Sequence, residues 1–196
     1  RREVLTKLSS LVLVVSGPSG VGKSTALAEL AELEEVEVVV SFTTRSRRQD
    51  ETDAVDYHFV DEETFREMVS RDGFLEWVTY DGHFYGTPQR AVEEVLERGR
   101  VAVLEIERQG TLAVKRTFPQ TVAVLLEPPS RGDLEARLRS RGASGEFLDR
   151  RLALAERDDP MRGDLYDEIV TSAETSETVE ALVRIIGSRY QPSVPD

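Results

Sequence analysis

The sequence contains no cysteine, which excludes disulfide bonds, thiolate metal ligands and a cysteine nucleophile. It also lacks long apolar runs. The run at residues 11–15 is far short of the roughly 20 residues that a membrane-spanning helix needs. No stretch near the start is long enough for the apolar part of a signal peptide. We therefore expect a cytoplasmic protein with no membrane partner.

Lysine is scarce among the basic residues. Of 25 basic side chains only Lys7, Lys23 and Lys115 are lysines, so a lysine at a chemically demanding position stands out. The 37 acidic residues outweigh the cations and leave a net charge of −12. Because non-specific affinity for nucleic acid depends on neutralising phosphates, this balance predicts no nucleic-acid partner.

Short β-branched runs alternate with longer amphipathic segments, a pattern typical of βαβ units around a parallel sheet. A chain of 196 residues is about the length of one domain. The runs predict five strands, at residues 11–15, 36–41, 101–106, 121–126 and 169–171. The amphipathic segments predict helices at residues 23–33, 88–98, 109–117, 131–140, 146–157 and 175–188. The expected fold class is α/β, with a five-stranded parallel sheet flanked by helices.

Residues 41–87 break this rhythm. They are rich in Thr, Asp, Tyr and Phe, and Asp81-Gly82 is a turn signal between aromatic residues. We expect a small mixed β insertion with a short helix near residues 62–70. The acidic run at 50–53 is expected to be a solvated loop, because it lacks the glycine and spacing of an EF-hand.

The run G-P-S-G-V-G-K-S at residues 17–24 matches the phosphate-loop pattern G-x-x-x-x-G-K-[ST]. It follows an expected strand and opens an expected helix, as this motif requires. Glycines let backbone N–H groups approach an anion closely, and the helix N-terminus attracts negative charge. We assign nucleotide binding to this loop, with Lys23 bridging phosphate oxygens and Ser24 offering its hydroxyl to Mg²⁺. The loop alone does not distinguish a kinase from a GTPase or a motor protein. The assigned residues are Gly17, Ser19, Gly20, Val21, Gly22, Lys23, Ser24 and Thr25.

The insertion carries four short motifs: S-F-T-T-R-S-R-R at residues 41–48, D-Y-H-F at 56–59, F-L-E-W at 74–77 and F-Y-G-T at 84–87. Taken singly, each is also typical of half-buried aromatics or solvated arginines. In this order behind a phosphate loop, the set resembles the guanylate kinase family. The resemblance runs from about residue 11 to residue 170 and includes L-E-I at 104–106, Q-G at 109–110 and P-P-S at 128–130.

The resemblance implies how the chain is organised and what it does. It implies a single domain over residues 1–196, with a P-loop NTPase core at 11–40, 88–136 and 153–190. It also implies a mixed α/β GMP-binding insertion at 41–87 and a helical lid at 137–152. The implied reaction is ATP-dependent phosphorylation of GMP, and of dGMP, to GDP by in-line phosphoryl transfer. Mg²⁺ is the implied cofactor, and GMP and ATP are the implied partners.

The resemblance also assigns roles to individual residues. The GMP phosphate would be held by Arg45, Arg48, Tyr57 and Tyr85, and the base would be surrounded by Ser41, Glu76, Thr87 and Glu105. The lid arginines, closing over the ATP phosphates, would be Arg137, Arg141 and Arg151. Together with Lys23 and Arg48, these three form the expected catalytic set.

Elementary chemistry agrees with the acceptor assignment. The Watson–Crick edge of guanine presents two donors, N1–H and the 2-amino group, and the Glu76 carboxylate can accept from both. Adenine lacks this donor pair, which would leave buried acceptors unpaired. Guanidinium groups such as that of Arg48 bind a phosphate monoester bidentately.

Four features depart from the family pattern. Glu107 replaces a shorter aspartate, Arg108 replaces an apolar residue, Ser172 replaces an asparagine, and the segment between Arg141 and Arg151 is one residue shorter. Two alternatives stay open: a non-catalytic interaction module of the same fold, and a kinase whose acceptor is a sugar phosphate. The intact phosphate loop opposes the first, and the Tyr and Glu residues of the insertion oppose the second.

Overall fold

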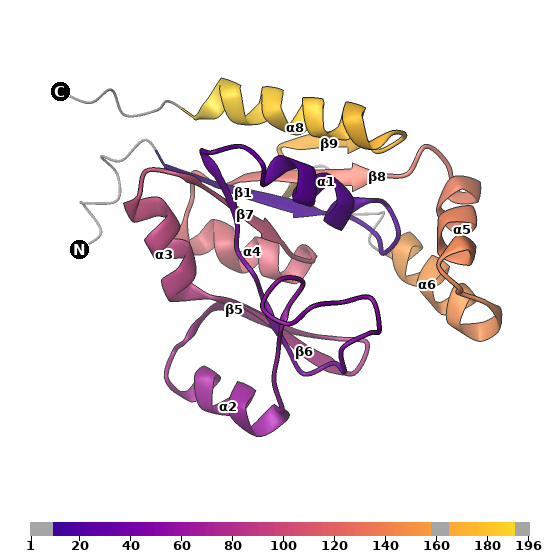
Figure 1. Ribbon diagram of the computed structural model, residues 1–196, viewed down its shortest axis with the longest axis horizontal. Coiled ribbons are helices and arrows are strands. Elements are labelled where there is room, and N and C mark those ends of the chain that lie inside the picture. Colours follow the sequence, from indigo (N-terminus) through magenta and orange to yellow (C-terminus); the bar gives the residue numbers. More distant parts are fainter. Residues whose placement is uncertain (1–9, 158–164, 191–196) are drawn as a thin grey trace.

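The computed structural model describes residues 10–157 and 165–190 (Figure 1). Its main sheet has the strand order β2-β7-β1-β8-β9, and every paired neighbour runs parallel. The strands are β1 (Leu11–Ser16), β2 (Val36–Val38), β7 (Val101–Glu105), β8 (Val122–Glu127) and β9 (Glu168–Thr171). The predicted five-stranded parallel sheet is confirmed.

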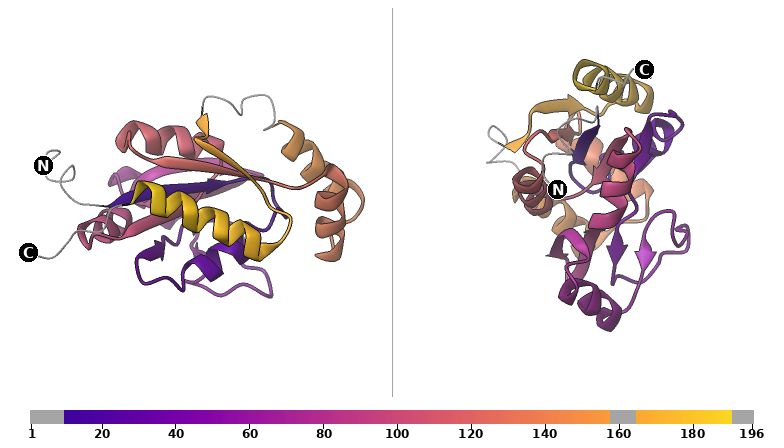
Figure 2. Two further views of the ribbon diagram at one scale, coloured as in Figure 1. Left: turned by 90° about the horizontal axis from the view of Figure 1, so that it is seen from above. Right: turned by 90° about the vertical axis from the view of Figure 1, so that its left-hand side faces the viewer.

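Strand β1 lies at the centre of the sheet, and its side chains alternate between two apolar cores. Leu13 and Val15 pack with α1 (Lys23–Leu30) and α8 (Thr175–Arg189), whereas Val12 and Val14 pack with α3 (Gln89–Glu97) and α4 (Arg108–Thr117). Figure 2 shows α8 running along one face of the sheet. Because both faces are covered, β1 is a continuous apolar run rather than an alternating one.

Two predicted elements each end three residues earlier than expected. Strand β2 ends at Val38, not at residue 41. The Val39 N–H still donates to the Val103 carbonyl at 2.9 Å, and beyond it the chain leaves this sheet. Helix α1 ends at Leu30, not at residue 33, because the next residues form tighter turns, with Leu33 N–H bonded to the Leu30 carbonyl.

The insertion forms a second, mixed sheet of four strands in the order β4-β3-β6-β5. They are β3 (Phe42–Thr43), β4 (His58–Phe59), β5 (Phe74–Tyr80) and β6 (His83–Pro88), and α2 (Glu62–Ser70) packs beside them. Asp81 and Gly82 form the β5–β6 turn with φ of 48° and 80°, which confirms the predicted turn. Phe65 of α2 stacks on Phe74 at 4.5 Å between ring centres and anchors the helix.

Helices α5 (Arg131–Ser140) and α6 (Gly145–Arg157) lie at one end of the sheet and contain the expected lid, residues 137–152 (Figure 1). Leu134 and Leu138 of α5 pack against Leu148 and Leu152 of α6 in a small core of their own. Helix α6 is continuous across the expected lid boundary at residues 152–153.

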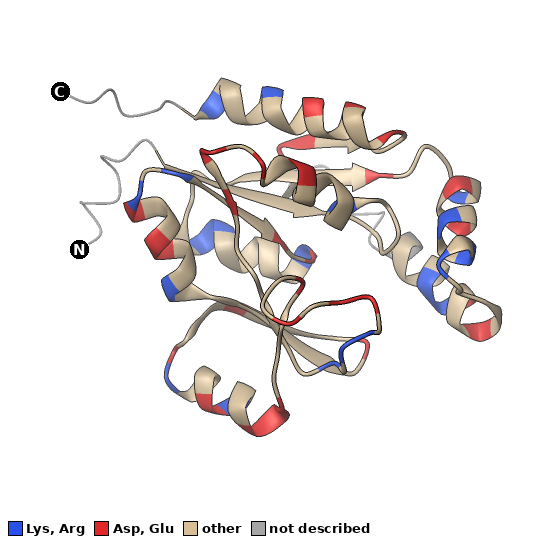
Figure 3. Cartoon of the chain, in the orientation of Figure 1, with Lys and Arg blue, Asp and Glu red and all other residues tan. Residues whose placement is uncertain are grey.

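Charged residues of both signs are spread over the surface, and Lys and Arg recur along α5 and α6 (Figure 3). Over residues 10–157 and 165–190, no helix combines the length and apolar character required to span a bilayer.

Candidate active site

The glycine-rich loop joins β1 to α1 at the carboxyl edge of the main sheet (Figure 1). Gly17 and Gly22 have φ of 148° and 112°, values that other residues rarely adopt. A Cβ on Gly17 would lie 2.5 Å from the carbonyl oxygen of Leu126. Glycine is therefore required here both for the backbone path and for the close packing of the loop on the end of β8.

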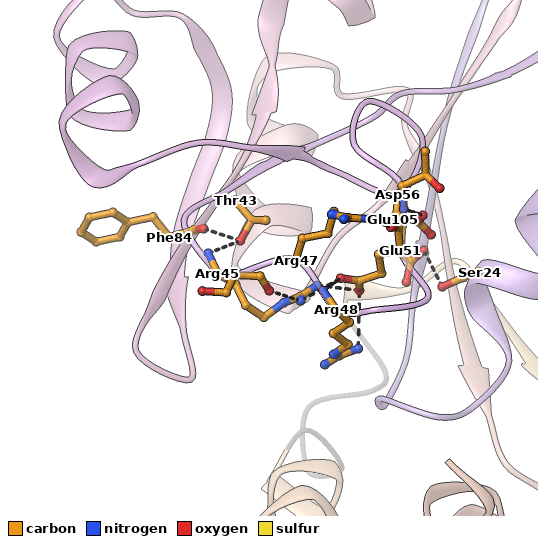
Figure 4. Close-up of polar contacts among 11 residues, drawn as sticks. Ser24, Thr43, Arg45, Arg47, Arg48, Glu51, Asp56, Phe84 and Glu105 are labelled. Carbon is orange, nitrogen blue, oxygen red and sulfur yellow. Dashed lines mark hydrogen bonds and ion pairs between the residues drawn. The ribbon is translucent and has the colours of Figure 1, made fainter. Parts of the chain in front are cut away.

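Lys23, Ser24 and Glu105 meet beside this loop. Lys23 Nζ donates hydrogen bonds to the carbonyls of Gly17 at 2.6 Å and Pro18 at 3.2 Å, and it lies 3.9 Å from Glu105 Oε1. The Ser24 hydroxyl donates to Glu105 Oε2 at 3.4 Å (Figure 4). These groups gather at the carboxyl ends of parallel strands, where open α/β sheets bind their ligands.

A second cationic cluster belongs to the insertion (Figure 4). The Arg45 guanidinium donates to both carboxylate oxygens of Glu51, at 2.8 and 2.9 Å. The backbone N–H of Arg48 donates to the same carboxylate at 2.8 Å. The Arg45 guanidinium lies 5.5 Å from the centre of the Tyr57 ring, which meets the Tyr85 ring edge to face at 5.8 Å. The Arg48 guanidinium lies 3.6 Å from Glu51 Oε1. Two guanidinium groups and two phenols thus lie close together, a donor set that suits a phosphate monoester.

The protonation states of this cluster follow from its surroundings. Burial opposes ionisation of the Glu51 carboxyl, but hydrogen bonds from Arg45 and from the Arg48 N–H outweigh it and lower the pKa of Glu51 below its ordinary value. Burial, together with the negative charge of Glu105, raises the pKa of the Tyr57 phenol. At neutral pH Glu51 is therefore an anion and Tyr57 a hydrogen-bond donor.

Glu76 and Thr87 lie opposite each other on β5 and β6. The Thr87 hydroxyl donates to Glu76 Oε1 at 2.6 Å, and Glu76 is only 7% exposed. Burial raises the pKa of the Glu76 carboxyl, against the opposing effect of the hydrogen bonds from Thr87. Each carboxylate oxygen accepts about two hydrogen bonds, so this carboxylate keeps acceptor capacity for a further planar pair of donors.

One cleft of about 750 Å³ joins the two clusters and is lined from the phosphate loop, the insertion and the ends of helices α5 and α6. The predicted site residues that line it are Ser19, Gly20, Gly22, Lys23, Ser24, Ser41, Arg45, Arg48, Tyr57, Glu76, Tyr85, Glu105, Arg141 and Arg151. Five predicted residues do not line it: Gly17, Val21, Thr25, Thr87 and Arg137. Glu105 lies on the phosphate-loop side through its contacts with Lys23 and Ser24.

Arg137 points into the packing behind the phosphate loop. Its guanidinium donates to the carbonyls of Val21 at 2.7 Å, Ser172 at 2.9 Å and Ala173 at 2.7 Å. The Ser172 hydroxyl donates to the same Val21 carbonyl at 2.9 Å. Arg137 and Ser172 therefore fix the backbone of the loop from behind, and a direct role of Arg137 at the phosphates stays a prediction.

Arg151 connects helix α6 to the insertion. Its side chain is 10% exposed and lies 3.6 Å from Asp81 Oδ2, while Arg150 lies 3.7 Å from Asp81 Oδ1. The Arg151 guanidinium also lies 5.1 Å from the centre of the Phe147 ring. These contacts join α6 to the β5–β6 turn beside the cleft.

The prediction of a solvated acidic loop at residues 50–53 is wrong for Glu51. Asp50, Thr52 and Asp53 are exposed, but the side chain of Glu51 is only 12% exposed. The available signal was the position of Glu51, six residues after Arg45 and three after Arg48, within a short loop. A nearby pair of cations draws one carboxylate of an acidic run inward.

The fold and site together define a P-loop nucleotide-binding protein. The central strand of a parallel sheet leads through a glycine-rich loop into a helix that begins with Lys23 and Ser24. The family model described as guanylate kinase matches residues 9–189.

Comparisons with individual proteins agree with this match. A guanylate kinase of Prochlorococcus marinus is 38% identical over 90% of this chain and 97% of its own length. A guanylate kinase of Thermus thermophilus is 43% identical over 93% of this chain and 83% of its own length. The crystal structure of guanylate kinase from Anaplasma phagocytophilum has a TM-score of 0.74 and 27% identity, covering 94% of this chain and 88% of that one. The chain belongs to the guanylate kinase family, and the resemblance drawn from its motifs is confirmed.

Proposed function

We propose that this chain transfers the γ-phosphoryl group of ATP to GMP, with GDP and ADP as products. Membership of the guanylate kinase family supports this reaction. The observation that carries the proposal for this chain is that two anion-binding clusters share one cleft of about 750 Å³. One cluster is the phosphate loop with Lys23, and the other holds Arg45, Arg48, Tyr57 and Tyr85.

The phosphate loop is the donor site in this proposal. The backbone N–H groups of residues 19–24 and the N-terminus of α1 would hold the β- and γ-phosphates of ATP. Lys23 already lies over the loop, so its ammonium would exchange the Gly17 and Pro18 carbonyls for phosphate oxygens. A compact ammonium with three donors suits this bridging role.

The oxygens of Ser24 and Glu105 fit a magnesium ion. Mg²⁺ in nucleotide kinases takes one or two protein oxygens and fills its remaining positions with water and phosphate oxygens. A hydroxyl and a carboxylate 3.4 Å apart at the loop match that donor set. We assign Ser24 as the ligand and Glu105 as its neighbour; the bound ion would neutralise charge on the phosphates.

The insertion is the acceptor site. The guanidinium groups of Arg45 and Arg48 and the phenols of Tyr57 and Tyr85 would bind the 5′-phosphate. Glu76, held by Thr87, would accept from N1–H and the 2-amino group of guanine. The assigned contacts are to the 5′-phosphate and the base and not to the ribose, so dGMP is expected to be an acceptor as well.

The transfer step requires alignment and charge neutralisation. A phosphate oxygen of GMP would attack the γ-phosphorus of ATP, and the bond from that phosphorus to the β–γ bridging oxygen would break. No general base is needed, because the attacking phosphate is already an anion. Arg48, Arg141 and Arg151 line the cleft and would stabilise the charge that spreads over the transferred group.

Chromatographic detection of GDP and ADP, with ATP, GMP and Mg²⁺ present, tests the proposal. We expect Lys23→Ala to lower turnover by about 100-fold or more, because it removes a cation from the transition state. Lys115→Ala is the matched control, since Lys115 is bonded to Asp167 at 2.9 Å and does not line the cleft. Absence of GDP with the wild type would refute the proposal, as would a Lys23→Ala variant that is no slower than Lys115→Ala.

A further inference from the structure

Gly110, in the first turn of α4, lies directly against the carboxylate of Glu76. A Cβ built on Gly110 would be 2.6 Å from Glu76 Oε2, 2.9 Å from Glu76 Cδ and 3.4 Å from Ile106 Cβ. Apolar atoms pack at about 3.5–4.0 Å, so even a methyl group would overlap the carboxylate. The carboxylate occupies the space that any side chain at position 110 would fill.

The backbone does not require glycine at this position. Among the glycines that the structure describes, seven have positive φ, and Gly110 is not one of them. Residue 110 lies within a regular helix, Arg108–Thr117, where alanine is more favourable than glycine by about 1 kcal/mol. The missing side chain therefore provides space rather than a backbone conformation.

We infer that Gly110 is a positioning residue that sets specificity for guanine, because its missing side chain lets the Glu76 carboxylate lie against α4. Thr87 fixes one carboxylate oxygen at 2.6 Å, and Gly110 provides the space for the other. The inference rests on the proposed function, in which Glu76 accepts from the guanine base. In this inference helix α4, which packs on the main sheet, determines the position of the Glu76 carboxylate.

A methyl group at position 110 would move the carboxylate rather than the helix. The carboxylate is the end of a flexible side chain, and it lines the open cleft. Restoring ordinary contact requires a shift of the order of 1 Å. Misplacing a binding group by about 1 Å can cost as much as 100-fold in rate or affinity, so recognition would suffer while the fold would not.

Gly187 supplies a matched control. It lies within another regular helix, α8, and a Cβ there would meet no heavy atom within 4 Å. Gly187→Ala and Gly110→Ala therefore make the same chemical change and the same gain in helix propensity. They differ in whether the new methyl meets Glu76.

Steady-state kinetics of Gly110→Ala, Gly187→Ala and Glu76→Ala with ATP and either GMP or IMP test the inference. IMP lacks the 2-amino group, so the ratio of kcat/KM for GMP to that for IMP reports how the base edge is read. We expect Gly110→Ala to raise KM for GMP about tenfold or more and to shrink that ratio, with KM for ATP within about twofold of the wild type. Tm should not fall, and Gly187→Ala should leave all kinetic constants unchanged.

A double variant separates positioning from a general structural effect. In the Glu76→Ala background the displaced carboxylate is absent, so adding Gly110→Ala should change KM for GMP by less than about twofold. An equal loss in both backgrounds would overturn the inference, as would a fall in Tm or a parallel rise in both KM values. If Glu76→Ala impairs GMP use but Gly110→Ala does not, this inference fails and the proposed function stands. If Glu76→Ala itself leaves GMP use unchanged, Glu76 does not bind the base, and both its assigned role and this inference are wrong.

Discussion

Glu51 binds Arg45 through both carboxylate oxygens, at 2.8 and 2.9 Å from the two terminal guanidinium nitrogens. Both side chains are largely buried, with 14% of Arg45 and 12% of Glu51 exposed. The same carboxylate accepts from the Arg48 N–H. Glu51 therefore sets the orientation of the arginines that are proposed to hold the GMP phosphate.

Glu51→Gln should loosen this cluster. We expect a loss of about 1.5–3 kcal/mol in the free energy of unfolding, because hydrogen bonds to a charged acceptor are lost. KM for GMP should rise several-fold, on the order of fivefold, with KM for ATP unchanged. Glu62→Gln is the control, because Glu62 pairs with Arg66 at 2.9 Å on an exposed face of the same insertion. Equal effects of the two substitutions would contradict the assigned role.

The stabilisation by Glu51 should also depend on pH. Its pKa is lowered in the folded protein, so the stabilising contribution is present above the ordinary carboxyl pKa. It is lost as the pH falls through the lowered value. Urea titrations of the wild type and Glu51→Gln should therefore differ at neutral pH and converge in acid. A difference that grows in acid would show the opposite sign of linkage.

Glu76 should behave in the opposite way. Burial raises its pKa, so the ionised carboxylate costs stability at neutral pH and that cost disappears as the pH falls through the raised value. Glu76→Gln should therefore raise Tm at neutral pH in the absence of nucleotide, while it weakens GMP binding. Calorimetry and GMP titration on the same preparation measure both effects. A lowered Tm together with unchanged GMP affinity would contradict this account.

Arg137 should matter through the phosphate loop. Arg137→Ala removes the guanidinium that donates to the Val21 carbonyl, while the Ser172 hydroxyl still donates to it. We expect a lower Tm and a KM for ATP raised about tenfold, with little change in KM for GMP. Arg137→Lys should not restore either, because one ammonium cannot reproduce a planar fork to three carbonyls. Arg139→Ala is the control, since Arg139 on the same helix pairs with Glu135 at the surface.

Asp81 should affect how Arg151 is placed beside the cleft. Asp81→Asn removes the charge that lies 3.6 Å from Arg151. We expect kcat to fall about twofold to fivefold with smaller changes in both KM values, because Arg151 loses its partner in the β5–β6 turn. Asp72→Asn is the control: Asp72 also has positive φ, 53°, in a turn of the insertion, and asparagine tolerates that conformation. If both substitutions reduce kcat equally, Asp81 has no specific role in placing Arg151.

Local signals account for what the sequence could predict. A few adjacent residues determine the local structure in three places: the apolar run of β1, the glycines of the phosphate loop and the Asp81-Gly82 turn. The insertion motifs likewise place Glu76 and Thr87 in one hairpin, where pairing makes them neighbours.

Contacts between distant segments could not be predicted in this way. Arg137 meets the Ser172 and Ala173 carbonyls across 35 and 36 residues, and Gly110 of α4 meets Glu76 on β5 of the second sheet. Such contacts depend on how α4 packs on the sheet and how α5 lies against the phosphate loop, which no local pattern specifies. Glu51 was misjudged for a related reason, since an acidic run is normally solvated unless a neighbouring element supplies cations.

The most direct test of the whole account is ADP release in the presence of Mg²⁺ and ATP with GMP, AMP, UMP, CMP or no acceptor. The two proposed phosphate sites in one cleft and the Glu76 carboxylate predict rapid release with GMP, and release with the other monophosphates close to the rate without acceptor. Release that ignores GMP, or that is equally fast with AMP, would contradict the account.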